Sequence, residues 1–280
     1  MALINFTPYM DELLGPEPNP ARNDNKLAFQ APCNVIVCAG TNSGKSFFCL
    51  NALINEDTRM TYDKIYLCIP TIDERPYLYL KKVLEEKVKN TNDQIKADKS
   101  LINPRLYENI DVFEHLPDAA HLKDALDNMD KSKQNVLIID DMIQNKAVNE
   151  LIKDFCIKNR KKNCSLIYVG HRYYDIPKMI RAMLNNGYVC LWDIPSVRAM
   201  HLYEAEFCDT ITPAQLKEMF AKARKQKYHP LVIDCRVDVD PHWKYRIGFN
   251  EPIGPDIPPP PKPVVDNTKV LKTLPKKPKV

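Results

Sequence analysis

The run Ala39–Ser46 carries the clearest chemistry in the chain. It reads Ala-Gly-Thr-Asn-Ser-Gly-Lys-Ser, the pattern of a phosphate-binding P-loop. In such a loop, backbone N–H groups surround an anion, and the following helix points its positive end at it. Lys45 is expected to reach the β- and γ-phosphates, and the Ser46 hydroxyl to bind Mg²⁺. The residues expected to bind the nucleotide are Gly40, Thr41, Asn42, Ser43, Gly44, Lys45 and Ser46.

The surroundings of this run favour the P-loop interpretation over a chance turn. The apolar run Asn34–Cys38 precedes it as a predicted strand, and the amphipathic stretch Phe47–Ile54 follows it as a predicted helix. Ala39 replaces the first glycine of the strict pattern, but Gly40 beside it keeps the turn pliable. Strand, loop and helix therefore occur in the order that the mechanism needs.

A second element is the apolar run Val136–Ile139, followed by Asp140 and Asp141. Such a run predicts a buried strand with Asp140 at its carboxyl end, where ligands of open α/β sheets bind. Asp140 is therefore expected to hold the Mg²⁺ shell, and Asp141 to act as the base that polarises the attacking water. The alternative for Asp141 is that it caps the following turn.

A third apolar run, Ser165–Val169, ends in Gly170 and His171. A polar side chain at this strand end can contact both the γ-phosphate and the water, so His171 is a candidate sensor, the alternative being a structural histidine. The long gap between Lys45 and Asp140 leaves room for extra strands between theirs, as in motor ATPases. A GTPase is disfavoured because Asn145–Val148 lacks the aspartate of a base-reading motif.

Apolar runs and amphipathic stretches alternate from residue 34 onward, which predicts right-handed crossovers and a mainly parallel sheet. The expected fold class is an α/β P-loop NTPase with a mainly parallel central sheet flanked by helices, of the additional-strand, RecA-like motor type. Leu231–Cys235 and Trp243–Phe249 are expected to pair as a C-terminal β-hairpin at a sheet edge. The predicted domains are a flexible arm (1–32), an ATPase domain (33–250) with a surface insertion (88–108), and a Pro/Lys-rich disordered tail (251–280).

Composition bounds the remaining possibilities. At 280 residues, the chain has room for one substantial α/β domain. The net charge of +4 is mild, so any DNA contact must come from local patches. Nine scattered cysteines without a Cys-x-x-Cys pair suit reduced core thiols rather than disulfides or zinc. No apolar stretch is long enough to span a membrane and no secretory signal is visible, so we expect a soluble intracellular protein.

The segment from Gly170 to Arg181, Gly-His-Arg-Tyr-Tyr-Asp-Ile-Pro-Lys-Met-Ile-Arg, carries a more specific resemblance. Together with the acidic strand and the run Leu231–Asp234, it resembles the sensor region of viral genome-packaging ATPases of the FtsK/HerA superfamily. These are the poxvirus-like enzymes shared by large DNA viruses, virophages and adenovirus-like transposable viruses. The resemblance covers roughly residues 34–250. His171 departs from it, because the family generally has glutamine there.

The resemblance implies a ring-forming motor that uses ATP and Mg²⁺ to push double-stranded DNA into a preformed capsid. Each active site of such a ring is completed by an arginine of the neighbouring subunit, for which Arg181 is the first choice, with Arg172 and Arg160 as rivals. A capsid or portal-vertex protein is the implied partner. The implied location is the host nucleus or a cytoplasmic viral factory, with association with the virion left open.

Contact with DNA is expected at backbone phosphates, because packaging cannot depend on base sequence. Two basic stretches qualify, Lys158–Lys162 and Lys222–Lys227, although both also suit helix ends. The alternatives are a cellular or plasmid DNA pump or helicase of the same superfamily, and a capsid-associated protein that binds nucleotide without turnover. A small-molecule kinase is weaker, because no arginine-rich lid is evident.

Overall fold

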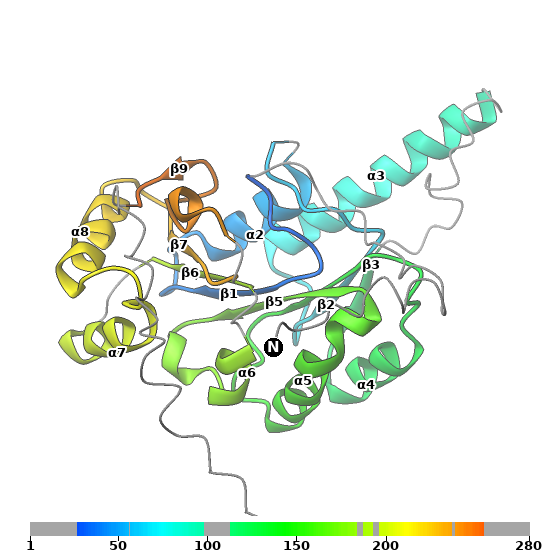
Figure 1. Cartoon of the computed structure of the whole chain (residues 1–280). Helices are drawn as coiled ribbons and strands as arrows, with labels where there is room; N and C mark the ends of the chain where they lie inside the picture. Colours follow the sequence, from blue (N-terminus) through cyan, green and yellow to red (C-terminus); the bar gives the residue numbers. More distant parts are fainter. Residues whose placement is uncertain are drawn as a thin grey trace, which may run out of the picture.

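In the computed structural model, the described residues are 27–55, 57–97, 113–183, 187–192, 196–236 and 239–254. In the helix Arg75–Ala97, side chains are described up to Glu86. The described residues form a nine-stranded sheet of order β3-β2-β4-β5-β1-β6-β7-β8-β9 (Figure 1). The strands are β1 (Asn34–Cys38), β2 (Lys64–Cys68), β3 (Phe113–Leu116), β4 (Asn135–Ile139), β5 (Cys164–Gly170), β6 (Gly187–Leu191), β7 (Leu231–Asp234), β8 (Tyr245–Ile247) and β9 (Glu251–Pro252).

The sheet is parallel from β3 to β6 and antiparallel from β7 to β9. This confirms the predicted α/β class and the antiparallel C-terminal strands. One strand, β5, separates the P-loop strand β1 from the acidic strand β4. The expectation of an extra strand between them is therefore confirmed, but the inserted strand follows the acidic strand in sequence. The strands that precede the acidic strand in sequence, β2 and β3, lie on the side of β4 away from β1.

Helices cover both faces of the sheet (Figure 1). On one face, α2 (Lys45–Ile54) and α3 (Arg75–Ala97) pack with Val35 and Val37 of β1. The other face packs Ile36 and Cys38 against the remaining helices. Those helices are α4 (Ala119–Asn128), α5 (Lys146–Lys158), α6 (Lys178–Ala182), α7 (Val197–Phe207) and α8 (Pro213–Arg224). The side chains of β1 alternate between two cores because successive residues of a strand point to opposite faces.

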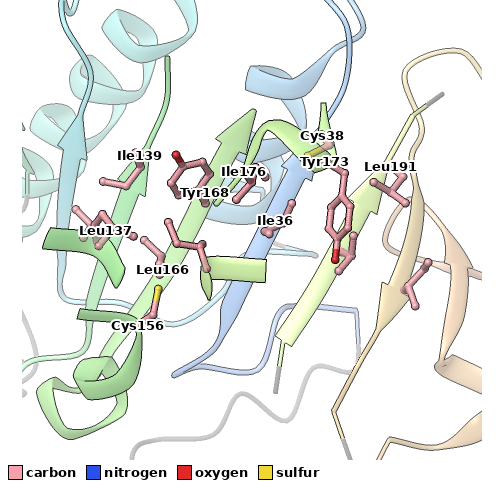
Figure 2. Close-up of a cluster of buried hydrophobic side chains, with 14 of the residues drawn as sticks. Ile36, Cys38, Leu137, Ile139, Cys156, Leu166, Tyr168, Tyr173, Ile176 and Leu191 are labelled. Atoms are coloured by element: carbon pink, nitrogen blue, oxygen red, sulfur yellow. The ribbon is translucent and has the colours of Figure 1, made fainter. Parts of the chain in front are cut away.

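Central strands of the sheet are apolar on both faces, as burial between two helix layers requires. Figure 2 shows one of the two cores, in which Ile36, Leu137, Leu166 and Leu191 come from four different strands. The nine cysteines are all free and seven are buried. Burial raises the pKa of Cys68 to about 12, so this thiol is an inert core group. The predicted use of cysteine as a small core residue is confirmed.

Several predicted boundaries differ from the structure. Residues assigned to the N-terminal arm enter the core, since Phe29 is 1% exposed and packs on Tyr188 with 4.6 Å between ring centroids. Helix α3 continues to Ala97, through half of the predicted insertion, and the later part of that insertion lies outside the described residues. Strand β9 extends the sheet into the predicted tail, whose remainder after Gly254 also lies outside them.

One α-helix of the described residues, α7, was not predicted at all. Helix α7 follows Ser196, whose side chain accepts a hydrogen bond from the Ala199 N–H as its N-cap. Its Met200 and Tyr203 pack into the core shown in Figure 2. None of the helices in the described part of the chain is long and apolar enough to cross a membrane.

Candidate nucleotide-binding site

The P-loop joins the carboxyl end of β1 to the amino end of α2. Its backbone is left-handed at Asn42 (φ 59°) and at Gly44 (φ 98°). The Ser43 hydroxyl donates to the Gly40 carbonyl at 2.6 Å and closes the turn. A side chain at position 44 is strained at this φ and approaches Tyr228 at 3.2 Å, so the second glycine of the motif is required here.

The amino end of α2 lacks the side-chain cap that other helices carry. Side chains of Asp118, Asn145, Ser196 and Thr212 cap α4, α5, α7 and α8. Gly44 occupies the same position in α2, and no side chain of the described residues bonds to that end. The first N–H groups of a helix have no partner within the helix, and their dipole favours an anion. This end of α2 is therefore open to a phosphate.

Lys45 folds back over the P-loop. Its Nζ donates to the Ala39 carbonyl at 2.8 Å and to the Gly40 carbonyl at 3.3 Å. The same Nζ lies 3.4 Å from Nδ1 of His171. The ammonium thus lies between the loop and the end of β5, as the P-loop motif predicts for a lysine that reaches the terminal phosphates.

Asp140 follows β4 and is only 7% exposed. The Tyr77 hydroxyl donates to its Oδ2 at 2.5 Å, and the backbone N–H of Asp141 donates to its Oδ1 at 2.9 Å. Burial raises the pKa of Asp140, although the hydrogen bond from Tyr77 opposes this shift. Burial, with the charge of Asp140 next, raises the pKa of Tyr77 well above its usual value, so Tyr77 is a hydrogen-bond donor.

Asp141 and His171 form the exposed part of the site. Asp141 has a left-handed backbone (φ 56°). Its Oδ1 lies 3.4 Å from Nε2 of His171, and the two side chains are 58% and 47% exposed. The cap of α5 is Asn145, so Asp141 does not serve as the cap of that helix. The three motifs meet where β1, β4 and β5 end, with His171 lying between Lys45 and Asp141.

The site is suited to a divalent cation. Glu74 lies near Asp140 and Asp141, and its pKa is raised first by burial and then by their charges. These carboxylates outnumber the nearby Lys45, so a cation would offset their repulsion. The described residues contain no group of three His, Cys, Asp or Glu side chains that could hold a metal alone. Ser46 and Asp140 are the residues that could hold Mg²⁺, together with nucleotide phosphates, as is usual for this ion.

Comparison with protein families supplies an assignment for the chain. The model of the family described as Poxvirus A32 protein matches residues 22–237, which include the P-loop, both aspartates and His171. The chain belongs to the Poxvirus A32 protein family. A comparison with curated protein sequences gives no match.

Solved structures similar to this A32-family chain share little sequence with it. B204, the genome packaging NTPase of Sulfolobus turreted icosahedral virus 2, in complex with ATP-gammaS, is 16% identical with a TM-score of 0.43, over 77% of this chain and 96% of that chain. B204, the DNA-packaging ATPase from Sulfolobus Turreted Icosahedral Virus, is 13% identical (TM-score 0.42; 80% and 98% covered). EccC of Thermomonospora curvata is 10% identical (TM-score 0.39; 78% and 38% covered). The family assignment does not rest on these likenesses.

Arg181, the first choice for an arginine acting on a neighbouring subunit, is held within the A32-family chain itself. Its Nη1 donates to Oε1 of Glu206 at 2.5 Å, and its side chain is 13% exposed. The guanidinium also lies over the rings of Tyr173 and Tyr174, at 5.1 and 4.8 Å from their centroids. These contacts secure α6 against α7, which is the opposite of what a residue reaching another subunit requires.

The two rival arginines lie at opposite edges of the sheet. Arg172 follows His171 at the carboxyl end of β5 and is exposed, and its side chain makes no hydrogen bond or ion pair with the part of the chain that is described. Arg160 lies in the turn of Asn159–Lys162, before the amino end of β5. The parallel strands put that turn at the edge away from the P-loop. Arg172 is therefore the better placed of the three.

The two basic stretches lie in different parts of the molecule. Lys158–Lys162 lies at the amino edge of the sheet, where Lys162 Nζ donates to the Leu126 carbonyl at 3.0 Å. Lys222–Lys227 lies at the end of α8, and Lys227 Nζ is 4.8 Å from the centroid of the Tyr228 ring. A contact of either stretch with DNA remains a prediction.

Sequence reasoning missed Tyr77 and Glu74 as parts of the site. Neither residue belongs to one of the motifs that the sequence analysis singled out. Nothing in their local pattern marks them, because their role depends on α3 beginning beside the end of β4. The one available signal is general: a buried tyrosine hydroxyl usually needs a hydrogen-bond partner.

Proposed function

We propose that this A32-family chain is an ATP-hydrolysing motor that translocates double-stranded viral DNA into a preformed capsid. The observation that carries the proposal is the convergence of Lys45, His171 and Asp141 around the open end of α2, with the buried Asp140 beside them. Phosphate binding, metal holding and water activation are the three parts that an ATP hydrolase needs. Membership of the A32 family supports the viral setting.

In this proposal, the P-loop backbone and Lys45 bind the triphosphate. The Nζ of Lys45 exchanges its contacts with the carbonyls of Ala39 and Gly40 for phosphate oxygens, which are stronger, charged acceptors. Ser46 and Asp140 would hold Mg²⁺, which when bound would neutralise charge on the β- and γ-phosphates. The hydrogen bond from Tyr77 already orients the Asp140 carboxylate, so Asp140 would need little reorganisation to hold the metal.

Hydrolysis is then assigned to the exposed half of the site. Asp141 Oδ1 orients the attacking water and accepts its proton as the oxygen bonds to the γ-phosphorus and the β–γ bridge breaks. His171, already between Asp141 and Lys45, donates to the γ-phosphate and reports its presence. Arg172 is our choice for the arginine that reaches the γ-phosphate bound by the neighbouring subunit, and a homo-oligomeric ring is implied by that role.

The DNA and capsid contacts complete the proposal. Double-stranded DNA would be held through its phosphates without regard to sequence, by Lys222–Lys227 or Lys158–Lys162, and the ring would dock on a capsid or portal-vertex protein. Its place of action would be the host nucleus or a cytoplasmic viral factory.

The test is steady-state ATP hydrolysis with and without duplex DNA. We expect stimulation by DNA in the natural protein, and loss of turnover in Lys45→Ala and Asp141→Asn. Lys123→Ala and Asp127→Asn are matched controls, because this exposed pair lies on α4 away from the site, with 2.9 Å between Nζ and Oδ2. Normal turnover in both site variants would sink the mechanism. A natural protein that binds ATP without turnover would instead favour a structural role.

A further inference from the structure

A pocket of about 260 Å³ opens beside the P-loop. Gly44, Phe47 and Asn51 line it from the loop and α2, and Tyr228, Phe249 and Asn250 line it from two turns near β7 and β8. None of these residues except Gly44 belongs to the predicted site. The pocket therefore adjoins the phosphate-binding loop without overlapping the cluster of Lys45, His171 and Asp141.

The strand order places this pocket on the other side of β1 from that cluster. Asp141 and His171 follow β4 and β5, whereas the pocket turns adjoin β7 and β8, beyond β6. Leu231 begins β7 and pairs both with Leu191, the end of β6, and with Ile247, the end of β8. The turn before β7 and the turn after β8 thus lie at the same sheet edge as the P-loop. A triphosphate in the loop has the hydrolytic residues on one side and this pocket on the other.

The wall formed by Tyr228 is held in a particular conformation. Tyr228 has a left-handed backbone (φ 68°), which a bulky residue rarely adopts unless its surroundings impose it. Its side chain packs directly on Gly44, where a Cβ would come within 3.2 Å. Gly248 (φ 59°) leaves room for His229, whose Cδ2 would lie 2.9 Å from a Cβ there. Two glycines and one strained tyrosine therefore fix this turn against the loop.

The lining suits a flat heteroaromatic group. Phe47 and Tyr228 expose 66% and 53% of their surface. Phe48 and Phe249, which also line the pocket, are buried and stack on each other with 4.3 Å between ring centroids. The Asn51 amide donates to the Phe47 carbonyl at 2.9 Å and accepts from Asn55 at 2.8 Å. An amide has two N–H donors and two lone pairs, so Asn51 keeps one of each. Aromatic faces with amide edges are the groups that bind nucleobases.

We infer that this pocket holds the nucleobase and ribose of the nucleotide whose phosphates bind the P-loop, an inference that rests on the proposed function. The base contacts the aromatic walls of Phe47 and Tyr228, and Asn51 and Asn250 bond to its polar edge. The assignment makes α2 a common frame for the whole nucleotide: its first turn binds phosphate, and the face carrying Phe47 and Asn51 binds the nucleoside.

The test compares two ligands by calorimetric titration in the presence of Mg²⁺, a non-hydrolysable ATP analogue and inorganic tripolyphosphate, which lacks base and sugar. Phe47→Ala and Tyr228→Ala are expected to raise the Kd of the analogue about ten- to a hundredfold, the usual contribution of a base–aromatic contact. Tripolyphosphate affinity is expected to stay unchanged in Phe47→Ala. Tyr79→Ala is the matched control, because Tyr79 is 57% exposed on α3 and lies outside the pocket.

Each outcome separates this inference from the proposed function. Suppose that Lys45→Ala abolishes binding of both ligands while neither pocket variant changes the affinity for either ligand. Phosphate binding by the P-loop is then supported, and the base is bound elsewhere. An equal loss of affinity for both ligands in Phe47→Ala would also overturn the inference, because the substitution would then act on phosphate binding by the P-loop. Phe47 is an exposed helix position where alanine is favourable, so this variant is expected to fold even if Tyr228→Ala does not. A natural protein that binds neither ligand overturns both proposals.

Discussion

Two neighbouring carboxylates divide the candidate site into a buried half and an exposed half. Asp140 is 7% exposed and accepts a 2.5 Å hydrogen bond from the Tyr77 hydroxyl. The side chain of Asp141 is 58% exposed, and its contact with His171 is 3.4 Å long. The buried half is fixed before any ligand arrives, whereas the exposed half has the loose geometry typical of catalytic groups that tighten on a bound substrate.

This difference predicts which substitutions change the rate of ATP hydrolysis and which change the stability of the fold. A buried carboxylate that loses a hydrogen-bond donor keeps an unsatisfied acceptor atom in the folded state, which is costly. An exposed carboxylate that is removed leaves only water behind. Variants of the exposed half should therefore change the rate of hydrolysis with little effect on unfolding, and variants of the buried half should change both.

The largest effect is expected at Arg172. If it acts on the neighbouring subunit, Arg172→Ala should lower DNA-stimulated kcat about 10³- to 10⁵-fold, the usual worth of an arginine finger. ATP binding and thermal stability should not change. Arg181→Ala is the comparison: it should lower stability, because it removes the ion pair with Glu206, but leave kcat of the folded fraction near normal. Reversed effects for the two arginines would restore Arg181 as the acting residue.

Asp141→Asn should lower kcat about 10²- to 10⁴-fold, because the amide cannot accept the proton of the attacking water. Steady-state hydrolysis gives kcat, and titration with a non-hydrolysable analogue should show unchanged affinity. Mixing this variant with Arg172→Ala should restore part of the activity, because some subunit interfaces then contain both natural residues. An absence of any recovery would count against an active site shared between subunits.

His171→Ala should lower kcat about 10²- to 10³-fold, as loss of one preorganised donor to the γ-phosphate does. His171→Gln should recover most of that loss, because glutamine can also donate to phosphate and accept from water. Parallel turnover measurements on the two variants decide the point. Equal loss in both would mean that the imidazole has a role that an amide cannot supply.

Tyr77→Phe tests the buried half. The hydroxyl of Tyr77 is fully buried, and its removal leaves Asp140 Oδ2 without this donor. We expect the free energy of unfolding to fall by about 1–3 kcal/mol, measured by urea denaturation without nucleotide. Tyr79→Phe on the same helix is the control and should change it by less than about 0.5 kcal/mol, because Tyr79 is exposed. Equal effects in both would mean that the bond to Asp140 does not stabilise the fold.

Local sequence determines the parts of the molecule that were predicted well. The loop of β1 and α2 was found because glycine, lysine and serine are needed at fixed spacing. Helix α8 is likewise encoded locally, because Thr212 and Gln215 form a capping box around Pro213, and its apolar residues follow a helical period. The later part of α3 was assigned to the surface insertion, because it is charged and lacks that period, although such residues are good helix formers.

Contacts between distant segments explain what was missed. The bond of Tyr77 to Asp140 joins residues 63 positions apart, and no local pattern encodes it. The containment of Arg181 depends on Glu206 in α7, the helix that was not predicted. The pocket of Phe47 and Tyr228 likewise needs the antiparallel reversal after β6, which brings the turn before β7 back to the P-loop. Types of residue could be predicted at each strand end, but not which of them face one another.

Movement of DNA tests the central claim most directly. A triplex-forming oligonucleotide bound at one end of a duplex is displaced when a motor moves along that duplex, so its release can be followed by fluorescence. We predict release by the full chain that requires ATP, is independent of duplex sequence, and is abolished in Lys45→Ala. Hydrolysis of ATP by the natural protein without any release of the third strand would contradict the account of this chain as a DNA-translocating motor.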